Sequence, residues 1–510
     1  MVLKVKKGEL NLMKKSLLLF ILVFATVLLV SCKNIRRPTD FNILSVADIE
    51  NLETKITFKV RQGVISDALV QLVEDFHEEY PFIEVNVSTI SGNYDLLRSS
   101  TILDINSKNA ENVPDLIIGY PDHFAEYYGG SNLVNLQYFI DDPDIGLDAE
   151  EMADFIQAYL PENRGFDENY PNDLYGLPFN KSTEVLVYNK TAFEVLYGED
   201  DYLTKIPTTW DEMKTRGADI ITKVKAGDLD NTFIDTYDPD TETTTYMKIS
   251  DYLSSPTNIQ FVPFGYDSSD NGFITLTRQF GAKYTERKSV LEGYVHFNND
   301  ESILAMTYFQ NMKNDGLFAT AAVFGAQYNS DALKAIQVLM TVGSTAGVGY
   351  NTSSKYELGF APIPYYSEDA KYVIQQGTNI GMLNHNNDEE KLASWLFVKF
   401  LMRPENTAAF AMATGGYLPV KASAYDTEDY SEYLTNPTLD KKEFSAAAKV
   451  ALYDYIEKEY KFFVDDAFIG SSKVREEAGR IFDAVIVNGE DAKSRIEAAY
   501  KTLSPYVPKD

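Results

Sequence analysis

Cysteine is almost absent from this chain, since Cys32 is the single example in 510 residues. One cysteine excludes an intrachain disulfide framework and any metal site built from several thiolates. The four histidines, His77, His123, His296 and His385, are scattered along the sequence and have no metal-ligand spacing such as H-E-x-x-H. We therefore expect neither a metal nor a cofactor.

Motifs for nucleophilic catalysis are missing as well. The sequence contains no G-x-S-x-G element and no lone catalytic cysteine pattern. With 76 acidic residues, the chain has many candidate carboxylate pairs of the kind that hydrolyse glycosides. We expect a protein without catalytic residues, and a secreted glycosidase is the enzymatic alternative.

Positive charge is also scarce. The chain has 46 basic against 76 acidic residues, which gives a net charge of −30. Such a charge opposes binding to nucleic acid phosphates and to an anionic membrane surface. The acidic residues are scattered, so most of them are expected on the solvated surface.

Long apolar runs are limited to one, Leu17–Val30, which follows Met13 and two lysines. About 14 residues fit a signal-peptide core and fall short of the roughly 20 needed to span a bilayer. The run leads into Leu29–Cys32, which resembles a bacterial lipobox, so we expect a signal peptide over 1–31 and lipid attachment at Cys32. Met13 is a better start for such a signal peptide than Met1, and both starts stay open.

The mature protein is thus predicted to be extracytoplasmic and held at the cell membrane by its N-terminal lipid. Residues 32–51 are mostly polar and are interpreted as a flexible tether. The remaining length is enough for two lobes with sizeable cores.

Apolar periodicity then predicts alternating strands and helices. The expected strands and helices of the first part are Ile56–Val60, a helix that begins at Ser66 or Asp67 and ends before Pro81, Ile83–Val87, Tyr94–Asn106 and Pro114–Tyr120. This order is typical of an α/β domain with right-handed crossovers. Tyr120 ends its strand at the sheet edge where open α/β sheets place ligands.

The stretch Tyr175–Lys190 has turn chemistry at Gly176 and Pro178, followed by the short strand Val185–Tyr188. Further on, Thr209 and Glu212 fit a capping box for a helix that begins at Trp210. Other expected features are a surface insertion over 229–255, helices over 298–313, 331–339, 389–402 and 404–414, strands over 340–344, 358–364 and 377–383, and a helical tail over 441–503.

Several of these segments together resemble the bacterial extracellular solute-binding proteins of family 1, the receptors of ABC importers that are similar to maltose-binding protein. The segments that carry the resemblance are Val113–Ile117, Tyr175–Lys190, Pro207–Glu212, Met340–Ser344 and Gly415–Val420. The resemblance implies a two-lobe fold that closes like a hinge on a ligand in a central cleft.

The resemblance also implies where the lobes begin and end. Lobe I is expected over 52–178 and 371–420, and lobe II over 179–370 and 421–510. Three segments are expected to cross between them, near Leu177–Asn180, Pro364–Gly377 and Tyr417–Tyr425.

Within the family, Pro178–Thr183 and Thr414–Pro419 resemble the subgroup that includes receptors for glycerol-3-phosphate and glycerophosphodiesters. The site residues that the resemblance and the chemistry of sugar binding suggest are Tyr94, Asp95, Tyr120, Asn180, Ser182, Trp210, Ser344, Gly377 and Tyr417. Trp210 is expected to be a sugar-stacking ring whose loss abolishes binding.

The phosphate-binding arginine of that subgroup has no clear counterpart, since the region near Lys441, Lys442 and Phe444 offers only lysines. We therefore expect a small carbohydrate ligand, with glycerol-3-phosphate or a glycerophosphodiester as the alternative. The expected partners are the ABC permease subunits and the membrane through the lipid, without nucleic acid, and the protein is expected to be a monomer. A surface adhesin is a further alternative.

Overall fold

The computed structural model describes residues 41–107, 109–129, 131–254, 261–384 and 387–508. The chain divides into residues 1–42 and a compact unit of residues 43–510, to which every element below belongs. The predicted signal peptide 1–31, the lipobox with Cys32 and the predicted tether as far as residue 40 lie outside the described residues. Across the described ranges, no helix has the length and apolar character needed to cross a bilayer.

The predicted tether does not extend to residue 51. Helix α2 (Val46–Ile49) lies inside that range, and its Ile49 is fully buried. Ser45 and Asp48 hold the start of this helix, because the Asp48 carboxylate accepts hydrogen bonds from the Ser45 amide and hydroxyl at 2.8 Å. The folded unit therefore includes this segment. The sequence did not indicate this, because the region is polar on average and its apolar residues are few.

The first part of the folded unit alternates strands and helices as predicted. Its elements are β1 (Thr54–Arg61), α3 (Val64–Glu79), β2 (Ile83–Ile90), α4 (Tyr94–Asn106), β3 (Leu116–Gly119), α5 (Pro121–Tyr128), α6 (Gln137–Ile140) and α7 (Ala149–Ala153). Helix α4 has the predicted bounds because Asn93 caps it, accepting a hydrogen bond from the Leu96 amide at 3.0 Å.

The middle of the chain has a similar alternation. Its elements are β4 (Leu177–Asn189), α8 (Lys190–Tyr197), α9 (Trp210–Lys225), β5 (Ile234–Asp238), β6 (Thr243–Tyr246), β7 (Phe264–Tyr266), α10 (Ser269–Gln279), β8 (Thr285–Ser289), β9 (Glu292–Val295), α11 (Asp300–Asn314), β10 (Phe318–Thr320), α12 (Asn329–Lys334), β11 (Met340–Ser344), α13 (Val348–Asn351) and β12 (Leu358–Ala361). The predicted insertion contains β5 and β6, a hairpin exposed at every residue. Helix α12 is shorter than predicted, because Ile336 adopts a left-handed backbone with φ of 58°.

The last part supplies β13 (Tyr372–Met382), α14 (Asp388–Leu401), α15 (Pro404–Thr414), α16 (Glu428–Thr435), α17 (Lys442–Lys449), α18 (Tyr455–Glu457), β14 (Lys461–Phe463), α19 (Ser471–Ile486) and α20 (Ala492–Thr502). Helix α15 has the predicted bounds. Pro404 occupies its first turn, and Gly415 ends it with a left-handed φ of 79°.

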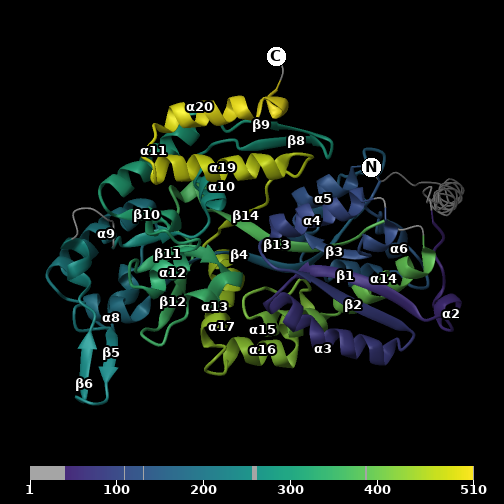
Figure 1. Cartoon of the computed structure of the whole chain (residues 1–510), viewed down its shortest axis with the longest axis horizontal. Helices are drawn as coiled ribbons and strands as arrows, with labels where there is room; N and C mark the ends of the chain where they lie inside the picture. The colour runs from purple at the N-terminus through teal and green to yellow at the C-terminus, as the bar shows by residue number, and fades with distance from the viewer. Residues whose placement is uncertain (1–40, 108, 130, 255–260, 385–386, 509–510) are drawn as a thin grey trace, which may run out of the picture. The chain divides into compact units, whose positions relative to one another are not determined.

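One sheet runs through the unit. Its strand order is β10-β7-β11-β4-β13-β3-β1-β2, while β12 pairs with β4 and β14 with β13. The strands β1, β2 and β3 are parallel to one another, as are β7, β10 and β11. We refer to the elements around the first group as lobe I and to those around the second as lobe II; in Figure 1 they lie on the right and left of the folded unit.

Strands β4 and β13 connect the two groups. The first half of β4 pairs antiparallel with β13, and its second half pairs with β11 and β12, so the strand passes from lobe I into lobe II. Lys181 marks the middle, where its backbone faces Gly377 of β13 and its carbonyl accepts the Leu418 amide at 2.8 Å. The three predicted crossings therefore meet at one place, while the residue-by-residue lobe boundaries stay a prediction.

Candidate functional site

A cavity of about 450 Å³ lies at the junction of the lobes. Its walls include residues of lobe I such as Arg61 and Tyr94, residues of the crossing segments such as Ser182 and Tyr417, and residues of lobe II such as Tyr328. The volume falls within the range of small-molecule sites. A ligand in this cavity touches both lobes, which is the condition for closure on binding.

The floor of the cavity is the sheet itself. Ser182 and Glu184 are two positions apart in β4, so their side chains lie on the same face of the strand, and both residues line the cavity. Gln376 of β13 lies opposite Ser182, and Ser344 of β11 lies opposite Glu184, so two adjacent cross-strand pairs present four polar side chains.

Glu184 is an ionisable group with little access to solvent, at 1% exposure. Its Oε2 accepts a hydrogen bond from the Tyr266 hydroxyl at 2.6 Å and a long one from the Thr275 hydroxyl at 3.4 Å. Burial raises the pKa of Glu184 to about 7, because an ionised carboxylate is poorly solvated there.

Asp267, in the loop after β7, is a second carboxylate of the cavity. It accepts hydrogen bonds from the amides of Asn329 and Ser330 at 2.6 and 3.3 Å, where α12 begins. Burial raises the pKa of Asp267 to about 6. Asp331 adds a third carboxylate at the rim, where it is 3.4 Å from Lys334.

Five tyrosine rings surround this floor, namely Tyr94, Tyr120, Tyr328, Tyr350 and Tyr417. Tyr94 and Tyr120 meet edge to face with ring centroids 4.9 Å apart, which fixes both rings. Burial raises the pKa of Tyr120 and Tyr417 above the usual range, so their hydroxyls remain neutral donors. Tyr328 and Tyr350 are 45% and 62% exposed, which leaves ring surface for a ligand to cover.

Arg61, at the end of β1, is the one basic side chain among the described residues that line this cavity. Its Nε donates to the Gly92 carbonyl at 2.7 Å, and its guanidinium lies 4.7 Å from the centre of the Tyr94 ring. One cation thus faces three carboxylates.

The cavity includes five of the nine residues that the sequence suggested: Tyr94, Tyr120, Ser182, Ser344 and Tyr417. Asn180 lies one layer behind them, with no exposed surface, and its Nδ2 donates to the Tyr94 hydroxyl at 3.4 Å. Gly377 lines a separate cavity of about 50 Å³ beside the main one.

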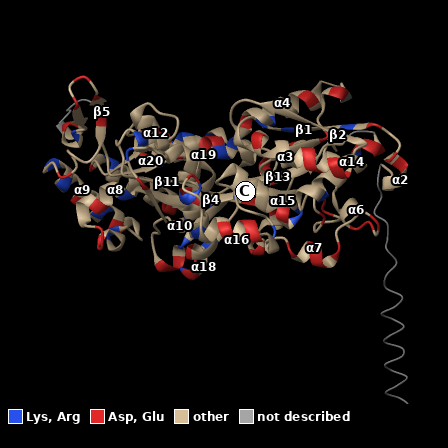
Figure 2. Cartoon of the chain, turned by 90° about the horizontal axis from the view of Figure 1, so that it is seen from below, with Lys and Arg blue, Asp and Glu red and all other residues tan. Residues whose placement is uncertain are grey.

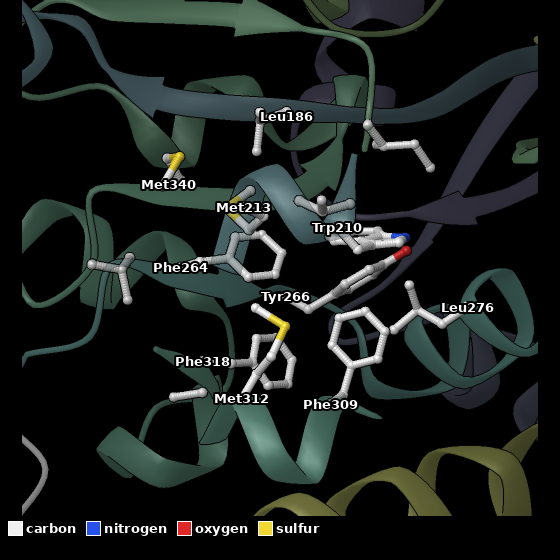
Figure 3. Packing of buried hydrophobic residues seen from close by; sticks show 14 of the residues in the cluster. Leu186, Trp210, Met213, Phe264, Tyr266, Leu276, Phe309, Met312, Phe318 and Met340 are labelled. Carbon is white, nitrogen blue, oxygen red and sulfur yellow. The ribbon is translucent and has the colours of Figure 1, made fainter. Parts of the chain in front are cut away.

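Two suggested residues lie elsewhere. The exposed side chain of Asp95 is 3.6 Å from Arg98 and does not line the cavity. Trp210 is 1% exposed and packs in the core of lobe II, against Phe264 and Phe309 (Figure 3). The expectation of a sugar-stacking tryptophan is therefore wrong.

The physical reason is the partner that the indole finds. Trp210 Nε1 donates to Gln279 Oε1 at 2.6 Å, which satisfies its only polar group inside the core. Its ring meets Phe309 edge to face at 5.1 Å, so the start of α9 is held by packing rather than by a ligand. The capping box predicted there is half formed, since Thr209 accepts the Glu212 amide while Glu212 accepts the Thr208 amide.

The sequence interpretation missed Arg61, Glu184, Asp267, Tyr328, Tyr350 and Gln376. Strand alternation from Ser182 was a usable signal for Glu184, and Gln376 precedes the suggested Gly377. For the others the sequence held no local signal, because they reach the cavity from separate elements.

The lysines considered as phosphate ligands do not line the cavity. Lys441 Nζ donates to the Met412 carbonyl at 3.0 Å, and Lys442 is 3.5 Å from Glu357. In the part of the chain that the structure describes, no group of three or more histidine, cysteine and acidic side chains is placed to hold a metal.

Comparisons with known proteins agree with this architecture. A family model for bacterial extracellular solute-binding proteins matches residues 71–438. The sn-glycerol-3-phosphate-binding periplasmic protein UgpB of Shigella flexneri serotype 5b is 23% identical over 394 residues, which are 74% of this chain and 77% of that protein.

Two solved structures show the same fold. UgpB from Mycobacterium tuberculosis in complex with glycerophosphocholine has a TM-score of 0.67 at 19% identity, over 89% of this chain and 98% of that one. An ABC substrate-binding protein from Listeria monocytogenes in complex with cycloalternan has a TM-score of 0.66 at 15% identity, over 89% and 98%. With the two-lobe α/β fold of type II periplasmic binding proteins, this chain belongs to the bacterial extracellular solute-binding proteins.

Proposed function

We propose that this protein is a lipid-anchored extracytoplasmic receptor that binds a neutral carbohydrate between its lobes and delivers it to an ABC permease. The observation that carries the proposal is the lining of the central cavity, where five tyrosine rings accompany three carboxylates and a single arginine. The protein is not expected to transform its ligand.

The tyrosines support a carbohydrate because a flat ring packs against the C–H face of a sugar while its hydroxyl remains available for hydrogen bonds. Tyr328 and Tyr350 of lobe II and Tyr94 of lobe I offer such rings from two sides. Ser182, Ser344 and the cavity carboxylates supply partners for sugar hydroxyls.

The balance of charge supports a neutral ligand. A phosphate brings up to two negative charges into a cavity with Glu184, Asp267 and Asp331, and Arg61 alone opposes that repulsion. Arg61 already uses its Nε on the Gly92 carbonyl, so the bidentate fork that favours phosphate is partly committed.

A second candidate is a receptor for glycerol-3-phosphate or a glycerophosphodiester. Arg61 favours it, because its guanidinium is a fixed cation inside the cavity. The names of the related proteins, which include a glycerol-3-phosphate-binding protein and a glycerophosphocholine complex, point the same way.

A thermal-shift panel on the purified mature protein separates these candidates. The panel holds glucose, xylose, maltose, sucrose, trehalose and maltotriose beside glucose-6-phosphate, glycerol-3-phosphate and glycerophosphocholine. A ligand at 100 times its Kd adds about 2.7 kcal/mol to the free energy of unfolding. We expect a neutral sugar to give the largest shift, and a response limited to the phosphates overturns the carbohydrate proposal.

The same protein tests the rival classes. Hydrolysis of an aryl-glycoside would establish a glycosidase, whereas a melting temperature that no solute raises would favour an adhesin. For the anchor, a Cys32→Ala variant is expected to leave the membrane fraction, since that thiol is the proposed lipid attachment point.

The proposed receptor acts as a monomer and does not bind nucleic acid. The net charge of −30 opposes phosphate backbones, and Figure 2 shows acidic residues spread over many helices of the folded unit. Sedimentation of the purified protein tests the monomer, and a filter-binding assay with DNA and RNA tests the lack of nucleic acid binding.

A further inference from the structure

Two residues of the cavity floor, Glu184 and Gln376, carry buried hydrogen-bond acceptors. Gln376 is opposite Ser182 across β13 and β4, and Glu184 is two residues further along β4 on the same face. Side chains in this diagonal relation have Cβ atoms within about 7–8 Å, so both can reach one small molecule.

Gln376 has a hydrogen-bond acceptor without a donor. Its Oε1 is buried and has no hydrogen-bond partner within the described part of the chain. A buried acceptor without a donor is unfavourable, and the hydroxyl of a bound ligand would satisfy it. Since Oε1 accepts and cannot donate, the missing group must be a donor.

Glu184 is held in place from three elements. Tyr266 of β7 and Thr275 of α10 donate to its Oε2, while Tyr455 of α18 donates to its backbone carbonyl at 2.5 Å. The charged groups that affect it are Asp270 of α10 and Arg475 of α19, which pair with each other at 2.7 Å. Nothing in this arrangement gives Glu184 a cation of its own.

We infer that Glu184 and Gln376 act as a paired acceptor that restricts the cavity to neutral ligands with at least two hydroxyl donors, and that Glu184 is the residue that excludes anionic ligands. This inference rests on the carbohydrate function proposed above and extends it. It makes Glu184, rather than the absence of an arginine beyond α15, the determinant against phosphate.

The electrostatic reason is straightforward. A carboxylate at the floor accepts a short, charge-assisted hydrogen bond from a sugar hydroxyl, which is stronger than a neutral one. In its ionised form, the same carboxylate repels a phosphate oxygen at that position. Because the pKa of Glu184 is near 7, a hydroxyl donor that favours the ionised form releases a proton on binding at neutral pH.

The test uses Glu184→Gln in the mature protein, which keeps an acceptor for Tyr266 and removes the charge. The titrations use two neutral sugars, glucose and maltose, and two phosphates, glucose-6-phosphate and glycerol-3-phosphate. They are measured by calorimetry at pH 7 in two buffers of different ionisation enthalpy. Wild type is expected to bind a neutral sugar with proton release and to reject its phosphate counterpart. Glu184→Gln should bind that sugar about tenfold more weakly, without proton release, and bind the phosphate more tightly.

Two further variants make the outcome specific. Glu443→Gln removes a partly buried carboxyl of α17 whose pKa burial also raises, but which lies outside the cavity lining, and it should behave as wild type. Gln376→Leu removes the orphan acceptor at similar volume and should weaken sugar binding without changing proton release. This variant tests the acceptor pair even where Glu184→Gln fails to fold.

The results separate the two proposals. In one outcome, wild type binds a sugar, and both floor variants bind it with the same affinity and still reject the phosphate. This outcome overturns the paired acceptor and leaves the carbohydrate function intact. A wild-type protein that binds only phosphates overturns both.

Discussion

The hydroxyl groups of Tyr94 and Tyr417 lie 3.1 Å apart, although 323 positions separate the two residues. Tyr94 begins α4 of lobe I, and Tyr417 follows α15 in the third crossing segment. Both rings line the central cavity. A hydrogen bond between the two hydroxyls therefore ties a wall of lobe I to the third crossing segment.

This pair gives the first prediction. Tyr417→Phe keeps the ring and removes a donor, so affinity for the sugar should fall about three- to tenfold, which is about 1 kcal/mol. Tyr417→Ala should lose more, because the ring is then absent. Tyr433→Phe is the control, since that buried tyrosine donates to the Gly415 carbonyl and does not line the cavity. Titration calorimetry measures all three, and wild-type affinity in Tyr417→Ala would remove Tyr417 from the site.

Trp210 should affect stability and not recognition. Trp210→Ala leaves a large cavity in the core of lobe II and is expected to cost about 3–5 kcal/mol in the free energy of unfolding. Trp210→Phe should be milder and should bind ligand with wild-type affinity once folded. Trp395→Phe, in the core of lobe I where the indole stacks on Phe139, is the matched variant. Urea unfolding and calorimetry decide, because a loss of affinity in a stable Trp210→Phe protein contradicts the core assignment.

These residues also show how far sequence reasoning reaches. The bounds of α4 and α15 could be predicted, because local signals set them: Asn93 as a cap, and Pro404 and Gly415 at the two ends. Whether Trp210 packs in the core or faces the cleft could not be predicted, because its hydrogen-bond partner Gln279 lies 69 positions away. A helix-start aromatic is equally suited to a cleft and to a core until that partner is known.

The site was predictable to a similar extent. Ser182, Ser344 and Tyr417 belong to segments with recognisable local patterns, so they were found. Arg61 and Tyr328 come from a strand end and a loop without any such pattern, and only the tertiary fold brings them to the floor that β11, β4 and β13 form. Glu184 was within reach, since it shares a strand face with Ser182.

Breaking the buried ion pair of Lys181 and Glu162 is expected to destabilise the crossing. Both side chains are nearly inaccessible, at 0% and 5% exposure, so the loss of one partner leaves a buried charge. Lys181→Met should cost about 3–5 kcal/mol, and the double variant with Glu162→Leu should recover much of that loss.

The control for this pair is Lys55→Met, which breaks an exposed pair with Glu84 at 2.7 Å. Exposed pairs contribute little, so this variant should unfold at nearly the same urea concentration as wild type. A double variant no more stable than Lys181→Met would show that the charge pairing is not what the single substitution removes.

Gly377 is predicted to be required by backbone geometry. Its φ is +101°, and an added Cβ would lie 2.0 Å from the Asn180 carbonyl oxygen. Gly377→Ala therefore should separate β13 from β4 and cost roughly 3 kcal/mol from strain and overpacking together. Gly325→Ala tests the φ alone, since φ is +71° there and nothing lies within 4 Å, so it should cost only about 1 kcal/mol. Equal unfolding midpoints for the two variants would contradict the steric account.

Glu184 should also make the stability of the ligand-free protein depend on pH in a characteristic direction. Its folded pKa of about 7 lies above its ordinary value of 4.5, so the folded state binds more protons between these values. The free energy of unfolding contributed by this group therefore falls as pH rises from about 5 to 8.

His123, whose pKa burial lowers, acts in the opposite direction in part of this window. The difference between wild type and Glu184→Gln isolates Glu184, and wild type should lose on the order of 2 kcal/mol relative to the variant across the window. Urea unfolding at pH 5, 6, 7 and 8 measures this difference, and a constant difference would mean that Glu184 ionises as freely in the folded protein as in the unfolded chain.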